Sequence, residues 1–391
     1  MVEIGERTMR LSRPLKDWMR IVSGRFPNLS LPQVRGLALW SFGMVLSQSS
    51  SLSRVAYGIA QLNDESYNRV RQRLKEWYQE AEAKRGDRRR SLVVSQCFVW
   101  LLRWVVALLP RGTQSLTLAM DASNIKQRFT VLSIAVLYEG CAIPVAWKVV
   151  AGGAKGSWKE HWQLLFQQLR EAVPSDWQVI VCADRGLYAE WLYHRIVELG
   201  WHPFLRINHQ GLWQPLNQRQ WQPLSQVIAH VGERFQQQVR CFKENSLECT
   251  LLGCWEPGYQ DPWLIVTDIA PEEANVLWYR LRAWIECSYR DFKSDGWQWQ
   301  NTRLQDPQRA ERLWLAMAVA MLWVVTLGSH SNGQSTPTVS ATPTPGSRSP
   351  HSLSCFSQGW LALIVHLIKG IPMTLHTWLP QHLPRPLVNS T

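Results

Sequence analysis

The sequence predicts an α/β protein: a mixed β-sheet with helices on its faces, preceded by a helical region and interrupted by a β-rich segment. Between residues 116 and 208, apolar runs typical of strands alternate with amphipathic stretches of helical length. The 391 residues are 46% hydrophobic and 18% charged. This composition is sufficient for a large core and excludes a disordered or fibrous chain.

The N-terminal region is helical and basic. Residues 37–78 follow a helical pattern, and residues 1–95 hold 17 of the 42 Lys and Arg but only 9 of the 30 Asp and Glu. This excess supplies most of the net charge of +12 and indicates a polyanionic partner, either a nucleic acid or an anionic membrane surface. Arg69, Arg71 and Arg73 can present a basic face to phosphates. The alternative is a solvated helix face without a ligand.

The middle of the chain predicts the sheet. The predicted strands span residues 116–123, 129–138, 142–150, 178–186 and 202–208, and the predicted helices span 159–172 and 188–199. Three neighbouring strands followed by helix–strand–helix–strand are typical of a mixed sheet covered by helices.

Residues 209–270 interrupt this alternation, because they are rich in Trp and Gln and contain only short strand-like pieces. Helical character returns at residues 272–292 and 307–327. The apolar run 313–327 has 15 residues, fewer than the roughly 20 that cross a bilayer, so we expect a buried core helix. Residues 329–352 read as a disordered Ser/Thr/Pro linker.

The predicted organisation has six segments. They are a helical basic region (1–95), a first core part (96–208), a β-rich insertion (209–270), a second core part (271–328), a linker (329–352) and a short tail (353–391). Eight cysteines without a C-x-x-C pair and an N-terminus without an apolar signal segment indicate a cytoplasmic protein.

Two acids end predicted strands. Asp121 follows an apolar strand, and Asp184 follows the run VIVCA. Functional groups gather at the carboxyl ends of strands in open α/β sheets, and hard divalent cations need convergent carboxylates. For each acid taken alone, a cap of the following loop or helix is the favoured alternative.

A third acid lies on the helix predicted after the insertion. Tyr279, Arg282, Arg290 and Lys293 fall on one helical stripe with Glu286. One interpretation is a row of intrahelical salt bridges, and the other is a metal ligand flanked by groups that hold phosphodiesters. Spacing alone leaves both open.

These residues resemble bacterial DDE transposases of the insertion-sequence-four family. The family signature is Tyr, two residues, Arg, three residues, Glu, six residues, Lys, and it matches Tyr279, Arg282, Glu286 and Lys293. The segments around the first two acids and after the signature are also similar, so the resemblance covers roughly residues 30–328. It implies a ribonuclease H-like core, an insertion before the third acid and an N-terminal part that binds transposon ends.

The resemblance also implies a chemistry. Asp121, Asp184 and Glu286 would be catalytic and hold two Mg²⁺ ions, for which Mn²⁺ can substitute. Water would free a 3′-hydroxyl at each transposon end, and this hydroxyl would form a hairpin and later attack target DNA. The partners implied are double-stranded DNA, both terminal inverted repeats and target, and a second copy of the chain in a synaptic dimer.

DNA contacts are predicted around the acids. Tyr279, Arg282 and Lys293 would hold terminal phosphates, and we expect Arg185 and Arg290 to assist, although a salt bridge is an equal alternative for Arg185. Trp213 or Trp221 would stack on an extruded base; the alternative for each is core packing.

Three functions therefore compete. The first is an active cut-and-paste transposase, an endonuclease of a bacterial mobile element that works at the nucleoid. The second is a domesticated or inactive copy that binds DNA without cutting it. The third is a membrane-associated protein, which the short apolar segments disfavour.

Overall fold

The computed structural model describes residues 11–85, 89–154, 156, 158–332 and 353–381, and at its centre lies a ten-stranded mixed sheet. The strand order is β3-β2-β1-β4-β5-β10-β9-β8-β6-β7. The strands are β1 (Ser115–Ile125), β2 (Phe129–Tyr138), β3 (Cys141–Ala151), β4 (Gln178–Ala183), β5 (His202–Arg206), β6 (Leu212–Pro215), β7 (Gln222–Pro223), β8 (Arg234–Cys241), β9 (Leu247–Cys254) and β10 (Trp263–Thr267).

The predicted mixed sheet is confirmed. Strands β1, β4 and β5 are parallel, whereas β1–β2 and β2–β3 are antiparallel. Every residue of β2 is buried, because the strand lies between two covered neighbours in the sheet. A continuous apolar run is the sequence pattern that such burial requires.

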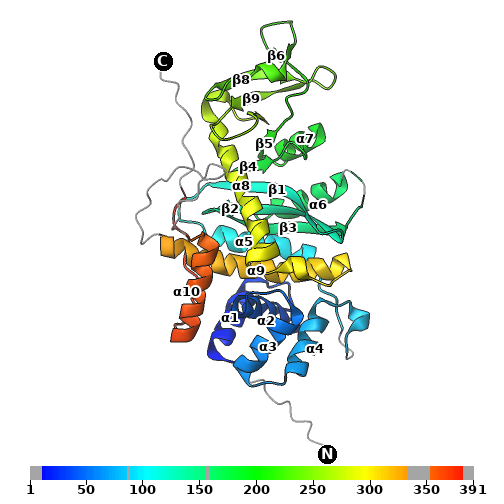
Figure 1. The fold of residues 1–391 in the computed structure, drawn as a ribbon, viewed down its shortest axis with the longest axis vertical. Coiled ribbons are helices and arrows are strands. Elements are labelled where there is room, and N and C mark those ends of the chain that lie inside the picture. Colours follow the sequence, from blue (N-terminus) through cyan, green and yellow to red (C-terminus); the bar gives the residue numbers. More distant parts are fainter. Residues whose placement is uncertain (1–10, 86–88, 155, 157, 333–352, 382–391) are drawn as a thin grey trace, which may run out of the picture.

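The segment predicted as a β-rich insertion continues the same sheet. Strand β10 pairs antiparallel with β5, through Ile265 opposite Arg206 and Val266 opposite Leu205, and β9, β8 and β6 follow outward. In Figure 1 these strands form the end of the molecule opposite the N-terminal helices. The sheet therefore connects the predicted insertion rigidly to the strands that carry the first two acids.

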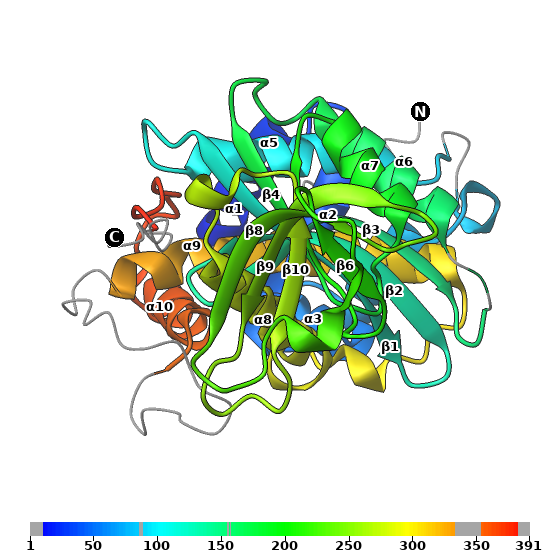
Figure 2. The same cartoon turned by 90° about the horizontal axis from the view of Figure 1, so that it is seen from above.

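The described part of the chain has ten α-helices. They are α1 (Arg13–Arg25), α2 (Leu31–Ser47), α3 (Leu52–Asn63), α4 (Tyr67–Tyr78), α5 (Phe98–Leu108), α6 (Lys159–Arg170), α7 (Glu190–Glu198), α8 (Ala283–Arg290), α9 (Pro307–Asn332) and α10 (Cys355–Lys369). Figure 2 shows α6 and α7 on one side of the molecule and α10 on the other. The rest of the predicted linker, residues 333–352, lies outside the described residues.

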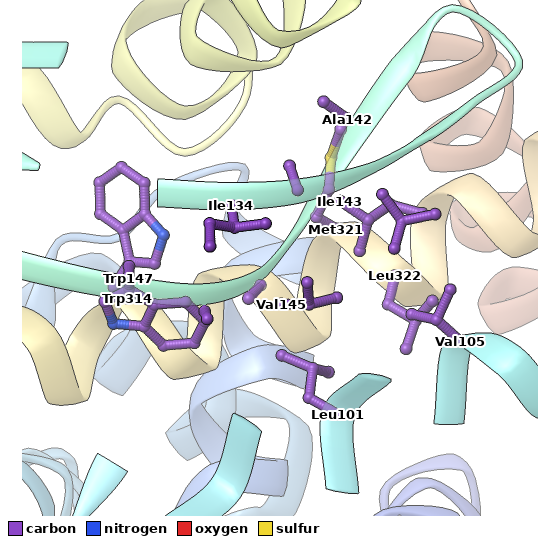
Figure 3. Close-up of a cluster of buried hydrophobic side chains, with 14 of the residues drawn as sticks. Leu101, Val105, Ile134, Ala142, Ile143, Val145, Trp147, Trp314, Met321 and Leu322 are labelled. Atoms are coloured by element: carbon purple, nitrogen blue, oxygen red, sulfur yellow. The ribbon is translucent and has the colours of Figure 1, made fainter. Parts of the chain in front are cut away.

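Helix α9 forms the centre of the hydrophobic core. It is the one described helix that is long and apolar enough to span a membrane, yet 94% of its apolar window is buried inside the fold, as we predicted for this run. It packs against β3 and α2, and Figure 3 shows Trp314, Met321 and Leu322 of α9 among side chains of α5, β2 and β3.

The tryptophans mainly fill this core. Ten of the 23 Trp side chains are among the largest fully buried groups of the described residues. Trp18 of α1 stacks on Trp323 of α9 with ring centroids 3.9 Å apart. Large aromatic rings thus join the N-terminal helices to the helix beneath the sheet.

The helical character predicted for residues 272–292 is present, but as three kinds of helix in succession and not as one α-helix. Residues Val276–Arg282 form a 3₁₀ helix, α8 follows directly, and Asp291–Asp295 form a π-helical turn. The side chain of Asn275 accepts a hydrogen bond from the backbone N–H of Leu277 and begins the 3₁₀ segment. Hydrophobic periodicity near 3.6 does not separate these three related helices over such short lengths.

Candidate active site

Parallel pairing places the first two acids side by side. The last pair between β1 and β4 joins Met120 to Ala183, so Asp121 and Asp184 are the next residues on adjacent parallel strands. The carboxyl ends of these strands share one edge of the sheet, which is where open α/β sheets carry their sites. Strand β1 itself continues beyond Asp121 to Ile125, paired with β2 alone.

A single guanidinium joins all three predicted acids. Nη2 of Arg282 lies 3.3 Å from Oδ2 of Asp121 and 3.8 Å from Oδ2 of Asp184, and its Nη1 lies 2.6 Å from Oε1 of Glu286. The Arg282 side chain is only 11% exposed, whereas that of Glu286 is 60% exposed. The acids therefore converge from two strands and one helix on a nearly buried cation.

The change of helix type aligns the signature residues. In a 3₁₀ helix residues three apart lie above one another, which brings Tyr279 and Arg282 to one face. In the following α-helix the four-residue spacing brings Arg282 and Glu286 together. Lys293 lies on the π-helical turn, and its Nζ is 5.7 Å from the ring centroid of Tyr289.

Tyr279 supports the second acid from a buried position. Its hydroxyl donates to Oδ1 of Asp184 at 3.3 Å, and its ring packs edge-to-face on Trp263 of β10. The ring belongs to a second buried cluster on the face of the sheet that carries Ile180 and Phe204. Packing thus holds the hydroxyl beside the carboxylate.

Tyr289 fixes the backbone at the first acid. Its hydroxyl donates to the carbonyl oxygen of Asp121 at 3.1 Å and lies 2.6 Å from Oγ of Ser133 on β2. The backbone N–H of Ala122 donates to the Asp121 carboxylate at 2.8 Å. Sequence reasoning missed Tyr289, and its position three residues after Glu286 was the available signal.

Arg206 is a second residue that we missed. It ends β5, the third parallel strand, and its Nη1 lies 3.8 Å from Oδ1 of Asp184. Like the two acids, it stands at the carboxyl end of a predicted strand, and that position could have identified it.

Burial and charge oppose one another at this site. Burial raises the pKa of Asp121, and the nearby Arg282 only partly offsets this shift. For Arg282, burial disfavours the charge, but Tyr279 and the three acids outweigh it, so its guanidinium pKa is raised. Burial lowers the pKa of Lys293. The guanidinium of Arg282 at the centre of the site therefore stays positively charged.

Four predicted contact residues lie apart from this group. Arg185 is exposed and lies 3.5 Å from the carboxylate of Asp261, which is the salt bridge that the sequence left open. Arg290 is exposed at the end of α8. Trp213 is 6% exposed and packs on Phe235, which favours its core-packing interpretation, whereas Trp221 is half-buried before β7.

The predicted basic face of the N-terminal region lies on α4. Arg69 and Arg71 are exposed, whereas Arg73 forms a salt bridge with Glu65 in the turn before the helix. Figure 1 places α4 at the end of the molecule away from β8, with α9 between it and the sheet. These arginines therefore belong to a surface separate from the three acids.

The resemblance implies divalent metal ions with Asp121, Asp184 and Glu286 as their ligands. Three carboxylates are the hard oxygen ligands that Mg²⁺ prefers, and all three face one positive group. Within the described residues, no three His, Cys, Asp or Glu side chains lie close enough to share an ion. The acids contact Arg282 instead. They fit a divalent cation by the chemistry of their oxygen donors, whereas their spacing is that of ligands around a guanidinium.

Fold and site together define an α/β protein with a carboxylate cluster at the carboxyl edge of its sheet. The transposase DDE domain family matches residues 114–323, which is more than half of the chain and includes Asp121, Asp184 and Glu286. The chain therefore belongs to this family and is a transposase.

Among the solved structures that are similar is the piggyBac transposase in a cryo-EM synaptic complex with hairpin DNA. The identity is 9% and the TM-score 0.39, over 98% of this chain and 86% of that chain. No curated protein sequence matches the chain.

Proposed function

We propose that the protein is a cut-and-paste DNA transposase of the insertion-sequence-four family, with a ribonuclease H-like core. The observation that carries this proposal is the convergence of Asp121, Asp184 and Glu286 on Arg282. Phosphodiester cleavage needs negative ligands for metal ions and positive groups for phosphates at one place. This cluster supplies both.

Asp121, Asp184 and Glu286 would hold two Mg²⁺ ions, or Mn²⁺ in their place. When bound, such ions activate a water molecule and stabilise the charge that develops on the attacking and leaving oxygens. The chain's own contribution is to hold the carboxylates in register, through the parallel pairing of β1 and β4 and through the hydroxyls of Tyr279 and Tyr289.

Arg282 would exchange partners during the reaction cycle. Without other cations it offsets part of the negative charge of the three acids. With the acids engaged by metal ions, its planar fork is free to hold a terminal phosphate. Lys293, whose ammonium lies over Tyr289, would add a second positive group on the same face. Arg206 would keep Asp184 oriented.

The DNA partners follow from this chemistry. We propose that the chain acts on double-stranded terminal inverted repeats and on target DNA, as a dimer at the bacterial nucleoid. The six segments predicted from the sequence are retained as its organisation, with end recognition in residues 1–95. Trp221, which is half-buried, would stack on a base of the hairpin.

The test is cleavage of DNA that carries the ends of the chain's own element, with Mg²⁺. Asp121→Asn and Glu286→Gln are expected to lose cleavage by on the order of a thousandfold while DNA binding persists, because metal ligation contributes several kcal/mol to such reactions. Asp176→Asn, at an exposed acid in the turn before β4, is the matched control.

Two outcomes would contradict this proposal. Equal cleavage by the wild type and both variants would refute the site. Binding without cleavage in the wild type would instead support an inactive copy that only binds DNA.

A further inference from the structure

Two histidines from distant parts of the sequence meet at the end of α9. His330 lies in the last turn of α9, and His376 lies in the C-terminal segment, residues 370–381, which follows α10. Figure 1 shows α10 beside the same end of α9. The centroids of the two imidazole rings are 5.4 Å apart, and the ring planes meet at 75°.

Several contacts hold the C-terminal segment on the core. Nε1 of Trp378 donates to Oγ1 of Thr326 on α9 at 3.0 Å, and the Trp378 ring stacks on Tyr138 with centroids 4.1 Å apart. The hydroxyl of Tyr138 donates to the carbonyl oxygen of Leu379 at 3.0 Å. These contacts begin two residues after His376, so its imidazole is held near α9 before any ligand binds.

The hydrogen bonds of the two rings leave one nitrogen on each for a ligand. Nε2 of His330 is buried and has no hydrogen-bond partner among the described residues. The His330 ring also donates a hydrogen bond to the backbone of Thr377, and this bond therefore uses Nδ1. A neutral imidazole with its proton on Nδ1 has a lone pair on Nε2, as in histidines that bind metal ions. On His376, Nε2 lies 2.9 Å from Oγ1 of Thr374, so Nδ1 is the nitrogen left to coordinate.

The spacing of the rings matches two imidazoles on one tetrahedral ion. With a metal–nitrogen distance of about 2.0–2.1 Å, tetrahedral coordination places the two ring centroids about 5–5.5 Å apart. The observed separation of 5.4 Å lies in this range. The alternative is edge-to-face packing of the rings without a ligand, which occurs at the same separation. That alternative leaves the buried Nε2 of His330 unpaired, which costs free energy.

We propose that His330 and His376 form a binding site for a transition-metal ion such as Zn²⁺, with water molecules as the remaining ligands. Imidazole nitrogens bind zinc, copper and nickel ions, whereas Mg²⁺ prefers oxygen. The site therefore takes a different class of ion from the one expected at Asp121, Asp184 and Glu286. Within the part of the chain that the structure describes, no third His, Cys, Asp or Glu completes a group with the two histidines.

A bound ion ties the C-terminal segment to α9. Because an ion that binds only the folded chain stabilises it by mass action, the site couples the concentration of the ion to the docking of residues 370–381. The inference does not depend on the proposed function, since neither histidine is assigned to DNA cleavage.

The test is Zn²⁺ binding by the full, untagged chain, measured by equilibrium dialysis at micromolar free Zn²⁺ after metal has been removed with EDTA. We expect His330→Gln and His376→Gln each to bind one Zn²⁺ fewer per chain than the wild type. Zinc held by the three acids or by the exposed Cys287 is common to all these chains and cancels in the comparison. Zn²⁺ should also raise the unfolding midpoint of the wild type by a few degrees more than that of either variant.

His230→Gln, at an exposed histidine before β8, is the matched control and should bind as much Zn²⁺ as the wild type. The side chain of His376 is exposed, so its replacement leaves the buried contacts of the segment in place. This variant therefore decides the test even where His330→Gln is less stable in EDTA. Equal Zn²⁺ binding by the wild type and His376→Gln would overturn the proposal in favour of edge-to-face packing. An equal rise of their unfolding midpoints with Zn²⁺ would overturn it as well.

Discussion

Arg282 is the residue on which the site depends. Its guanidinium is shared by three carboxylates that would otherwise repel one another. Asp121 depends on this positive charge most, because burial already disfavours the charged form of its carboxyl group. The site thus holds its own counter-ion in the absence of added metal.

We predict that Arg282→Ala lowers stability by about 1–3 kcal/mol without divalent metal. Loss of one partner of a fully buried pair costs more, but Asp184 and Glu286 are partly exposed to water. Added Mg²⁺ should then raise the unfolding midpoint of the variant more than that of the wild type. The measurement is thermal unfolding across a Mg²⁺ titration.

Arg290→Ala, at the exposed end of α8, serves as the control and should change stability by less than about 0.5 kcal/mol. A Mg²⁺ response of Arg282→Ala no larger than that of the wild type would contradict the counter-ion role.

Asp291 gives a pH-dependent contribution to stability. Burial raises its pKa to about 7, and the nearby Asp295 adds to the shift. Since its pKa in the unfolded chain is about 3.9, the native state binds the proton more tightly between these values. Its contribution is therefore present at low pH and lost as the pH rises from about 4 to about 7.

We predict that Asp291→Asn removes this slope. The variant should lose less stability than the wild type between pH 5 and pH 8, by on the order of a few kcal/mol. Urea unfolding at both pH values is the measurement. Asp176→Asn, at an exposed acid, should keep the wild-type slope, and an identical slope in Asp291→Asn would show that Asp291 does not titrate as described.

At the scale of elements, α9 and α10 cross very closely. A Cβ on Gly359 would lie 1.9 Å from the carbonyl oxygen of Val324, and one on Gly328 would lie 2.0 Å from that of Cys355. The obstacle in both cases is backbone, which cannot rotate away. Glycine is therefore required for α10 to dock on the core.

We predict that Gly359→Ala destabilises the protein by about 1–3 kcal/mol, because α10 must move away from α9. Docking buries Cys355, so the variant should also expose this thiol to alkylation. The measurements are the unfolding midpoint and the alkylation rate of Cys355 by mass spectrometry.

Gly24→Ala is the matched control, since nothing lies within 4 Å of its added Cβ. It should be neutral or stabilising by up to about 1 kcal/mol, as expected for alanine in a helix. Equal alkylation of Cys355 in both variants would refute the close crossing.

At the scale of the whole molecule, an ion cluster joins the N-terminal region to the core. Glu80, just after α4, accepts hydrogen bonds from Arg309 at 2.7 Å and from Arg312 at 3.0 Å, both on α9. Arg312 is 5% exposed and also donates to the backbone carbonyl of Tyr78. The hydrogen bond from Arg309 is the largest cause that lowers the pKa of Glu80 to about 2.

We predict that Glu80→Gln destabilises the chain by about 1–3 kcal/mol at pH 7, because Arg312 then lacks its buried counter-charge. The wild-type contribution is present above about pH 4.5 and lost as the pH falls towards 2, so the two proteins should converge in acid. Chemical unfolding at pH 7 and pH 3 is the measurement. Glu82→Gln, at an exposed acid, should match the wild type at both pH values.

Local sequence patterns were enough to predict much of the sheet. Strands β1–β5 were predicted from apolar runs, because strands buried on both faces leave no other pattern. Helix α1 lies in the region predicted as helical, residues 1–95, whereas α5 and α10 were not predicted as helices. Helix α5 is apolar around most of its circumference, and periodicity does not distinguish such a helix from a buried strand.

The candidate site likewise has features that the sequence predicted and features that only the tertiary structure decided. The position of Asp121 and Asp184 after apolar runs, and the spacing of Tyr279, Arg282 and Glu286, are local properties that the sequence determined by itself. The prediction that Asp121 ends its strand is wrong, because β1 continues to Ile125 through its pairing with β2. Only the tertiary structure decided that the acids share one guanidinium and that Trp213 packs in the core. It also brought in Arg206 and Tyr289. Spacing along a chain specifies neighbours on one element, whereas contacts between β1, β4, β5 and α8 depend on the register in which those elements pair.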